Sequence, residues 1–506
     1  MKANVDLIMV CAGSQGPADK MHVPLGLLYI GSELERNGYD VKIHHLLPEE
    51  FEDALPKIRA REPLWVGLSV LSGMTTYWAA NHSKRIRETM PGTPIVWGGP
   101  HASAMPAACA REPYVDYVVR GEGEVTAVEL SEALHSGSDV TGIASLGYKT
   151  GEGTSFVNTM RPLVEDIDRY EINWELLDLE EYKSTSYKQT IGKQSIAFFS
   201  SRGCPYKCAF CSTPRYTGKS FRGHSPGYVE RNLAYLKERY GFNSVYFSDD
   251  NFMTDRERGL EVIRRVTGLG ISVDTLDVRL NQLNDDVMSQ FNDMGAQGIF
   301  FGWESANDRI LKLMRKGLTV DLIREKAKLF KKHGITAWAS SIIGSPTETR
   351  EEIYNTIDFS MWLRDTLPTR STVASFRYMP LPNTALIEVA VEEGFVVPER
   401  QEDWKIIDPI GPYYEMPWVK WRTPDDEKFL AFAQELSRNG MLNMIPNSYY
   451  GLGFVHNFFV HRMRSKVLRR QREVDTEYRA FYSARNTASR IVRGRRASLD
   501  SQAMAS

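Results

Sequence analysis

Short apolar runs and longer amphipathic stretches alternate along the first part of the chain. The apolar runs predict strands over 5–10, 40–44, 65–70, 94–97 and 115–119, and the stretches between them have the periodicity of helices. Because strand and helix alternate, we predict an α/β domain over 1–140, built as a doubly wound parallel sheet.

The same alternation returns near residue 195. Apolar runs predict six further strands, over 195–201, 244–248, 271–276, 298–302, 335–339 and 371–376. One of the intervening helices is expected to begin at Thr254, whose spacing to Glu257 is that of a capping box. Six βα units predict a partial (β/α)6 barrel, open on one side, over 191–400.

Two segments break this rhythm. Residues 141–190 are acidic and aromatic, which indicates a bridge between the two domains. Residues 401–506 are predicted to be a helical C-terminal region with an arginine-rich tail between 461 and 496. We interpret the tail as a solvated face or frayed end, with binding to an acidic partner as the alternative.

Aromatic side chains gather at the start of this C-terminal region. They could form a lid over a substrate, but packing of a helical cap onto the barrel is the favoured interpretation, because aromatic side chains are usually core. The residues concerned are Trp404, Tyr413, Tyr414, Trp418 and Trp421.

The composition excludes several classes of protein. With 506 residues, 42% hydrophobic content and a formal charge of -2, the chain is expected to be soluble and globular, with more than one domain. The near-neutral charge argues against a nucleic-acid partner. No apolar run reaches the roughly 18 residues that span a bilayer, and Asp6 interrupts any signal-like stretch. We therefore expect a cytoplasmic protein.

Three of the five cysteines lie in one short run, with the spacing Cys-x3-Cys-x2-Cys at Cys204, Cys208 and Cys211. A structural zinc site takes four protein ligands, and ordinary iron–sulfur carriers supply four thiolates. Three thiolates therefore leave one metal position open for chemistry. The alternative is a zinc site completed by a distant histidine such as His224.

The two remaining cysteines, Cys11 and Cys109, lie in apolar surroundings and are interpreted as small buried side chains.

Glycine and polar residues follow the predicted strands of both domains, where parallel sheets bind ligands. In the first domain they have no G-x-G-x-x-G fingerprint, which disfavours a nicotinamide or flavin cofactor. Alternatively, the glycine pairs serve only to form tight turns between a strand and the helix that follows it. The strand-end residues are Ser69, Ser72, Gly98, Gly99, Gly121 and Glu122 in the first domain, and Asp249, Asp250, Arg279, Glu304, Ser340 and Ser341 in the second.

The cysteine run, with Gly203 before it and Phe210 within it, resembles the radical S-adenosylmethionine (SAM) superfamily. In that superfamily three cysteines hold a 4Fe–4S cluster, and SAM chelates the fourth iron. The motifs at 24–31, 66–69, 97–101 and 119–124 are similar, in this order, to the cobalamin-binding domain of one radical SAM subclass. The resemblance covers about residues 1–400.

This resemblance implies roles for particular residues. Cys204, Cys208 and Cys211 would hold the cluster, with Phe210 beside it. Asp249 and Asp250 would accept hydrogen bonds from the SAM ammonium, Arg279 would meet its carboxylate, and Glu304 its ribose or amino-acid end. Ser340 and Gly344 would line the SAM pocket, the latter near adenine. Ser69, Ser72, Gly98 and Gly99 would lie along the nucleotide tail of cobalamin, with Gly121 and Glu122 near the corrin.

Taken singly, Asp250 or Glu348 could equally be a helix cap or a surface ion pair.

The loop after the first strand departs from one common cobalamin motif. Many cobalamin proteins ligate cobalt through an Asp-x-His-x-x-Gly histidine, whereas the spacing from Asp19 to His22 to Gly26 differs here. We interpret His22 as an ordinary loop histidine. Loss of this ligand is usual in the subclass, although a domain that kept the fold and lost the cofactor remains an alternative.

The resemblance implies a cobalamin-dependent radical SAM methyltransferase that acts on an unactivated carbon of a small-molecule natural product. SAM would supply a 5′-deoxyadenosyl radical, cobalamin the methyl group, and a reducing protein such as flavodoxin or ferredoxin the electron. A cyclase or rearrangement enzyme like the anaerobic magnesium-protoporphyrin monomethyl ester cyclase shares this order of domains. A non-catalytic cluster or metal-binding module is the alternative from another class. The sequence nominates no catalytic acid or base.

Overall fold

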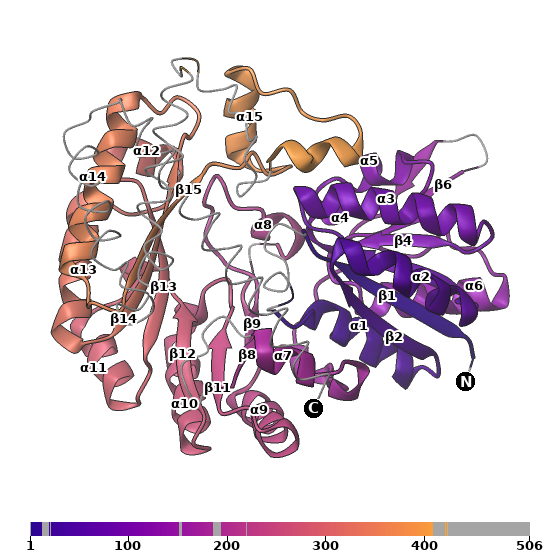
Figure 1. Ribbon diagram of the computed structural model, residues 1–506, viewed down its shortest axis with the longest axis horizontal. Coiled ribbons are helices and arrows are strands. Elements are labelled where there is room, and N and C mark those ends of the chain that lie inside the picture. The colour runs from indigo at the N-terminus through magenta and orange to yellow at the C-terminus, as the bar shows by residue number, and fades with distance from the viewer. Residues whose placement is uncertain are drawn as a thin grey trace, which may run out of the picture.

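The computed structural model describes residues 2–12, 20, 22–150, 154–185, 194–218, 220–407, 420 and 423. Figure 1 shows two α/β domains side by side, the N-terminal one in indigo and purple and the second in pink. Tyr413, Tyr414, Trp418, Trp421 and the arginine-rich tail lie outside the described residues. Among the helices that are described, none is long and apolar enough to cross a bilayer.

The N-terminal sheet has the strand order β2-β1-β3-β4-β5-β6-β7 in the described part of the chain. Strands β1 to β5 pair in parallel, which confirms the doubly wound sheet. Its elements are β1 (Asn4–Val10), α1 (Leu25–Arg36), β2 (Asp40–Leu46), η2 (Pro48–Glu50), α2 (Phe51–Ala60), β3 (Trp65–Ser69), α3 (Met74–Thr89), β4 (Ile95–Gly98), α4 (Gly99–Ala104), α5 (Pro106–Arg111), β5 (Tyr117–Val119), α6 (Glu124–Ser136), β6 (Leu146–Lys149) and β7 (Ser155–Val157).

The sheet continues beyond residue 140. Strands β6 and β7 add to its edge in antiparallel pairing, and they lie in the segment that the sequence assigned to the bridge. After them the bridge runs through η3 (Ile167–Arg169), η4 (Trp174–Leu176) and α7 (Glu180–Thr185). The indole of Trp174 donates to Asn232 Oδ1 at 2.9 Å, and so fastens the bridge to the second domain.

The second sheet is entirely parallel, with the order β15-β14-β13-β12-β11-β8, as expected for an open barrel of six βα units. Its helices lie outside the curved sheet (Figure 1). The elements are β8 (Ser195–Phe198), β9 (Ser201–Arg202), α8 (Thr213–Tyr216), β10 (Arg222–Gly223), α9 (Pro226–Tyr240), β11 (Ser244–Phe247), η5 (Phe252–Thr254), α10 (Arg256–Gly268), β12 (Ser272–Asp277), η6 (Leu280–Gln282), α11 (Asp285–Asp293), β13 (Gly298–Glu304), α12 (Asp308–Leu313), α13 (Val320–His333), β14 (Thr336–Ile343), α14 (Arg350–Thr366), β15 (Thr372–Arg377), α15 (Ala385–Glu392) and η7 (Gln401–Ile407).

The start of α10 corrects one prediction. Its N-cap is Asp255, whose side chain accepts from the amide of Arg258 at 3.1 Å, and not Thr254. The hydroxyl of Thr254 donates instead to the carbonyl of Asn251 at 3.0 Å within η5. A short helical turn in front of α10 therefore occupies the residue that the sequence pattern favoured.

The two domains share a continuous apolar core. The face of the N-terminal sheet covered by α1 and α6 belongs to the same buried cluster as the bridge and the barrel. Helices α2 and α3 cover the opposite face with a separate cluster. After α15 the chain returns to the first domain, where the buried Trp404 of η7 packs edge-on against His101 at 5.4 Å. The two domains are therefore joined twice, once through the shared apolar cluster and once through Trp404 of η7, which follows the last strand of the barrel.

Candidate functional site

The cysteine run forms a loop between β9 and α8, above the carboxyl end of the barrel strands. Gly203 begins this loop with φ +82°, and a Cβ there would lie 2.3 Å from the carbonyl oxygen of Ser220. Only glycine fits this close approach. The amide of Ala209 donates to the carbonyl of Met314 at 2.8 Å, so the barrel fixes the loop from the other side.

The three cysteines are partly buried and form no disulfide. Within the described residues, no three His, Cys, Asp or Glu side chains converge on the position of a single metal ion. A 4Fe–4S cube takes each thiolate on a different iron, so its ligands surround a larger volume than those of one ion. Three thiols on one short loop fit such a cluster.

His224 does not complete a zinc site. Its Nε2 lies 2.9 Å from the hydroxyl of Tyr29, and its Nδ1 lies 2.8 Å from Asp168 Oδ1. Burial lowers the pKa of His224 to about 4, so the ring is neutral. Because both ring nitrogens have hydrogen-bond partners within the protein, the zinc alternative that relied on this residue is wrong.

Arg279 lies beside the cysteine loop. Its Nη1 donates to Cys208 Sγ at 3.0 Å, and its guanidinium carbon lies 3.9 Å from the ring centroid of Tyr206. A cation and hydrogen-bond donor next to a ligand sulfur stabilises negative charge on an iron–sulfur cluster. The donor set therefore fits an anionic cluster, and Arg279, predicted to meet the SAM carboxylate, contacts one of the predicted cluster cysteines.

The two neighbouring carboxylates after β11 have different surroundings. Asp249 is 1% exposed and accepts from the amide of Ser200 at 3.1 Å, from the Ser200 hydroxyl at 2.9 Å and from Ser201. Burial raises its pKa to about 6. The structure thus places Asp249 inside the protein, where it holds the turn between β8 and β9.

Asp250 instead borders the cavity between the two domains that is described below. It accepts from the amide of Gly203 at 3.2 Å and from the Thr213 hydroxyl at 2.8 Å, and burial raises the pKa of its carboxyl group. Of the two predicted acceptors, Asp250 is the one on a cavity wall.

Glu304 ends β13 in a left-handed conformation, with φ +62°. Its carboxylate folds back over Gly302, where a Cβ would lie 2.0 Å from Glu304 Oε1. Lys316 donates to the same oxygen at 2.6 Å, and Lys316 Nζ lies 5.7 Å from the ring centroid of Phe210 in the cysteine loop. The pair therefore links the end of β13 to the predicted cluster site.

Sequence reasoning missed Lys316, because it lies after a short helix and not at a strand end. It also missed Asp277 on β12, although this residue stands two positions before Arg279. Tyr246 donates to both carboxylate oxygens of Asp277 at 3.2 Å, and burial raises the pKa of Asp277 well above its usual value.

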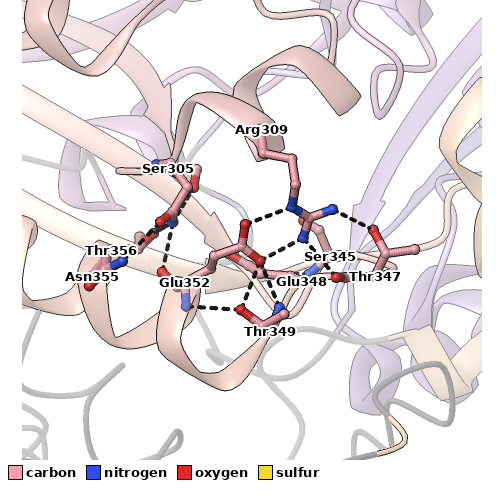
Figure 2. A network of polar contacts seen from close by, with 10 residues as sticks. Ser305, Arg309, Ser345, Thr347, Glu348, Thr349, Glu352, Asn355 and Thr356 are labelled. Atoms are coloured by element: carbon pink, nitrogen blue, oxygen red, sulfur yellow. Dashed lines mark hydrogen bonds and ion pairs between the residues drawn. The ribbon is translucent and has the colours of Figure 1, made fainter.

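The end of β14 leads into the segment predicted to flank adenine. Ser340 pairs in register with Gly302 of β13, and Gly344 has φ +75°. Figure 2 shows how the turn that follows is fixed. The amide of Ser345 donates to Glu348 Oε2 at 2.9 Å, and Arg309 of α12 donates to both carboxylate oxygens of Glu352, at 2.8 and 2.6 Å. Glu348 is thus neither a helix cap nor a surface ion pair; its burial raises its pKa to about 8.

A cavity of about 330 Å³ lies between the two domains. Its floor is apolar and runs between the N-terminal sheet and helices α1 and α6, and its rim is rich in glycine. An apolar slot with a rim of backbone suits a flat ring system such as the base of a nucleotide tail. Five of the residues predicted to meet cobalamin line it, namely Ser69, Gly98, Gly99, Gly121 and Glu122, and the barrel contributes Arg202, Gly203 and Asp250.

Ser72, which was also predicted to meet the nucleotide tail, has a different contact. Its hydroxyl lies 2.9 Å from Nδ1 of the buried His101, whose Nε2 lies 2.8 Å from Gln401 Oε1. Ser72 therefore belongs to the contact that joins η7 to the first domain. His22 is exposed, and its ring centroid lies 6.0 Å from that of Tyr246.

Buried ion pairs cross the interface beside this cavity. Arg222 donates to both oxygens of Glu122, at 2.5 and 3.0 Å, and Arg202 lies 2.8 Å from Glu124 and 3.4 Å from Glu122. Burial alone would raise the pKa of Glu122, but Arg222 and Arg202 together lower it below its ordinary value. Arg202 also lies 4.5 Å from the ring centroid of Tyr29. These contacts hold β9 and β10, on either side of the cysteine loop, against the segment between β5 and α6.

Comparison with known families agrees with this geometry. The radical SAM superfamily matches residues 198–360, and the B12 binding domain matches residues 17–131. An uncharacterized methyltransferase of Pyrococcus horikoshii is 35% identical over 405 residues, which cover 79% of this chain and 83% of the relative.

Two further relatives are more distant. The anaerobic magnesium-protoporphyrin IX monomethyl ester cyclase of Synechocystis is 27% identical, and the match covers 65% of this chain and 66% of the cyclase. The cytidylyl-2-hydroxyethylphosphonate methyltransferase of Streptomyces wedmorensis is 25% identical, over 74% and 79%.

Among solved structures, the cobalamin-dependent SAM radical enzyme OxsB has the same fold. The TM-score is 0.69 at 16% identity, over 92% of this chain and 72% of that one. The order of the two domains is therefore shared along most of the chain.

Proposed function

Because this chain belongs to the radical SAM enzymes that carry an N-terminal cobalamin-binding domain, we propose that it transfers a methyl group to a carbon atom of a small molecule. The cofactors of this family are a 4Fe–4S cluster, SAM and cobalamin. The observation that carries the proposal is the cavity of about 330 Å³, because the predicted corrin edge forms one wall and the cysteine loop borders the other.

When bound, the cluster and SAM supply a 5′-deoxyadenosyl radical, and cobalamin supplies the methyl group. The protein's contribution is to position them. Cys204, Cys208 and Cys211 would hold the cluster, and Arg279 would stabilise negative charge at Cys208. Gly98 and Gly99 would let the nucleotide tail of cobalamin approach the backbone closely, and Gly121 would do the same for the corrin. Two reactants held in one orientation react faster than free ones, and the buried interface excludes water from them.

In this proposal the parts of the chain divide the work. Residues 1–140, extended by β6 and β7, bind cobalamin, the rest of 141–190 forms the bridge, 191–400 bind the cluster and SAM, and 401–506 form the C-terminal cap on the barrel. An electron donor such as flavodoxin or ferredoxin would reduce the cluster, in the reducing cytoplasm that free thiolates require.

Methyl transfer is favoured over cyclisation by the relatives. The Pyrococcus protein and the Streptomyces enzyme are both named as methyltransferases. Of the three relatives described above, the Pyrococcus protein has the highest sequence identity to this chain. The magnesium-protoporphyrin cyclase is the reason to keep cyclisation as the second candidate.

Methyl-deuterated SAM separates the two functions. Reconstituted holoenzyme is incubated without oxygen with labelled SAM, a one-electron reductant and a small-molecule extract of cells that express the protein. Methyl transfer predicts 5′-deoxyadenosine together with a product that carries the label. Formation of 5′-deoxyadenosine with an altered but unlabelled product would contradict methyl transfer and support the cyclase alternative. The Cys208→Ala variant is the control and should give neither.

A further inference from the structure

We propose that a second cavity, of about 560 Å³, binds an anionic group of the substrate, and this inference rests on the function proposed above. The cavity lies between α4, α5 and the end of β5 on one side, and the turn after β15, α15 and η7 on the other. The side chains that carry the argument are Ser103, Arg111, Arg120, Asn383 and Trp404.

The charge of this cavity is positive. Arg111 and Arg120 line it, and the described lining residues include no Asp or Glu. The nearest acidic residue in sequence, Glu112, is engaged elsewhere, since its Oε1 accepts from the amide of Gln401 at 2.8 Å. Two guanidinium groups without a carboxylate on the same wall attract an anion.

Two residues that line the cavity each carry a buried donor with no acceptor among the described residues. The donors are Arg120 Nε and Trp404 Nε1. Trp404 is fully buried, and its edge-on contact with His101 fixes the orientation of the indole. Buried N–H groups are nearly always paired in folded proteins, so both side chains would gain a hydrogen bond by turning toward an acceptor-rich ligand in the cavity.

The second cavity shares a wall with the first. Arg120 directly precedes Gly121, which lines the first cavity, and Ser103 lines the second cavity while its hydroxyl oxygen accepts from the amide of Gly121 at 2.9 Å. Asn383, in a left-handed conformation with φ +59°, belongs to the barrel side of the same chamber. A substrate anchored here by its anionic end is therefore held beside the predicted corrin edge.

The chemistry points to a carboxylate or a phosphate. Both groups carry two oxygens that can accept two parallel hydrogen bonds from one guanidinium group. A lysine ammonium group cannot make this pair of bonds. Arg120 is accordingly a specificity-determining residue in this proposal, and Arg111, which is exposed, contributes charge at the entrance.

Chemical modification of arginine tests the site without knowledge of the substrate. Holoenzyme is treated with phenylglyoxal in the presence and absence of pyrophosphate, and separately of succinate, and the modified peptides are quantified by mass spectrometry. We expect either anion to protect Arg111 and Arg120, with Arg59 of α2, an exposed arginine outside both cavities, unprotected. Equal protection of Arg59, or no protection of Arg120, would overturn the proposal.

Binding of pyrophosphate by calorimetry gives the second measurement. Arg120→Ala should weaken binding about tenfold or more, and Arg120→Lys should fall between this variant and the wild type, because it keeps the charge but loses the fork. Iron content, corrin content and melting temperature should stay at wild-type values. Unchanged affinity in Arg120→Ala would contradict the assignment.

Cobalamin itself carries a phosphate group. A further experiment therefore tests whether this phosphate, and not a substrate, occupies the second cavity. If loading with cobalamin alone protects Arg120 and abolishes pyrophosphate binding, the anion is the cofactor's own and the substrate assignment is wrong. Equal binding with and without cobalamin supports a substrate site. Neither result depends on methyl transfer, so failure of the labelled-SAM experiment is distinguishable from failure of this one.

Discussion

Arg202, two residues before Cys204, forms an ion pair of 2.8 Å with Glu124, the first residue of α6 in the other domain. The two side chains are 15% and 5% exposed. A contact so close to both predicted cofactor sites means that their relative placement depends on individual side chains as well as on the shared apolar core.

Removal of one partner of this pair should destabilise the protein strongly. Arg202→Met leaves Glu124 buried without its cation, which typically costs about 3–5 kcal/mol, whereas the double variant with Glu124→Gln should cost less than the sum of the single variants. Urea unfolding of the four proteins measures this. The exposed pair of Arg256 and Asp286 is the matched control, and its removal should cost about 1 kcal/mol or less. Additive effects at Arg202 and Glu124 would show that the two do not interact.

Cys208→Ala should abolish assembly of the 4Fe–4S cluster and leave the N-terminal domain able to bind cobalamin. The reason is that the cysteine loop belongs to the second domain, whereas the glycines predicted to meet cobalamin follow strands of the N-terminal sheet. Iron analysis and the visible spectrum of bound corrin measure the two properties separately. Cys109→Ala, which removes a buried thiol away from the loop, should keep its iron. Wild-type iron content in Cys208→Ala would refute the ligand assignment.

Arg279→Met should lower the reduction potential of the cluster by tens of millivolts. The variant removes a cation and a hydrogen bond to Cys208 Sγ, and both favour the reduced, more negative state. A redox titration followed by electron paramagnetic resonance measures the shift, with Arg256→Met as the control for loss of an exposed positive charge that pairs with Asp286. An unchanged potential would place Arg279 outside the cluster's electrostatic environment.

Glu348 should make stability depend on pH. Its pKa is about 8 in the folded protein, because of burial, against about 4.5 for an exposed glutamate. Between these values the folded state holds a proton that the unfolded chain has lost, so stability is full below about pH 4.5 and declines as the pH rises to about 8.

Glu348→Gln keeps the shape and the acceptor for the Ser345 amide but cannot lose a proton. Its melting temperature should therefore exceed that of the wild type by a margin that grows from pH 5 to pH 8. Parallel melting curves across this range would contradict the raised pKa.

The strands and the two α/β folds could be predicted because the hydrophobic period and the alternation of strand and helix are local signals. All eleven predicted strands are present. Local signals failed where a tertiary contact decides the role. Asp249 and Asp250 are adjacent in sequence, yet only the fold places one inside the protein and the other on a cavity wall.

The interface could not be predicted for the same reason. Glu122 and Arg222 are a hundred residues apart, and no periodicity connects them. Likewise, the pairing of His224 with Tyr29 and Asp168, which excludes it as a metal ligand, depends on three segments that meet only in the folded chain.

The central claim is that one chain holds the cluster and cobalamin facing the same cavity, and their magnetic interaction tests it most directly. Protein loaded with the reduced cluster and with cob(II)alamin contains two unpaired spins. The account predicts that the cob(II)alamin resonance is broadened or split when the cluster is reduced, and that Cys208→Ala restores the unperturbed spectrum. A doubly loaded sample whose spectrum is the sum of the two isolated signals would contradict it.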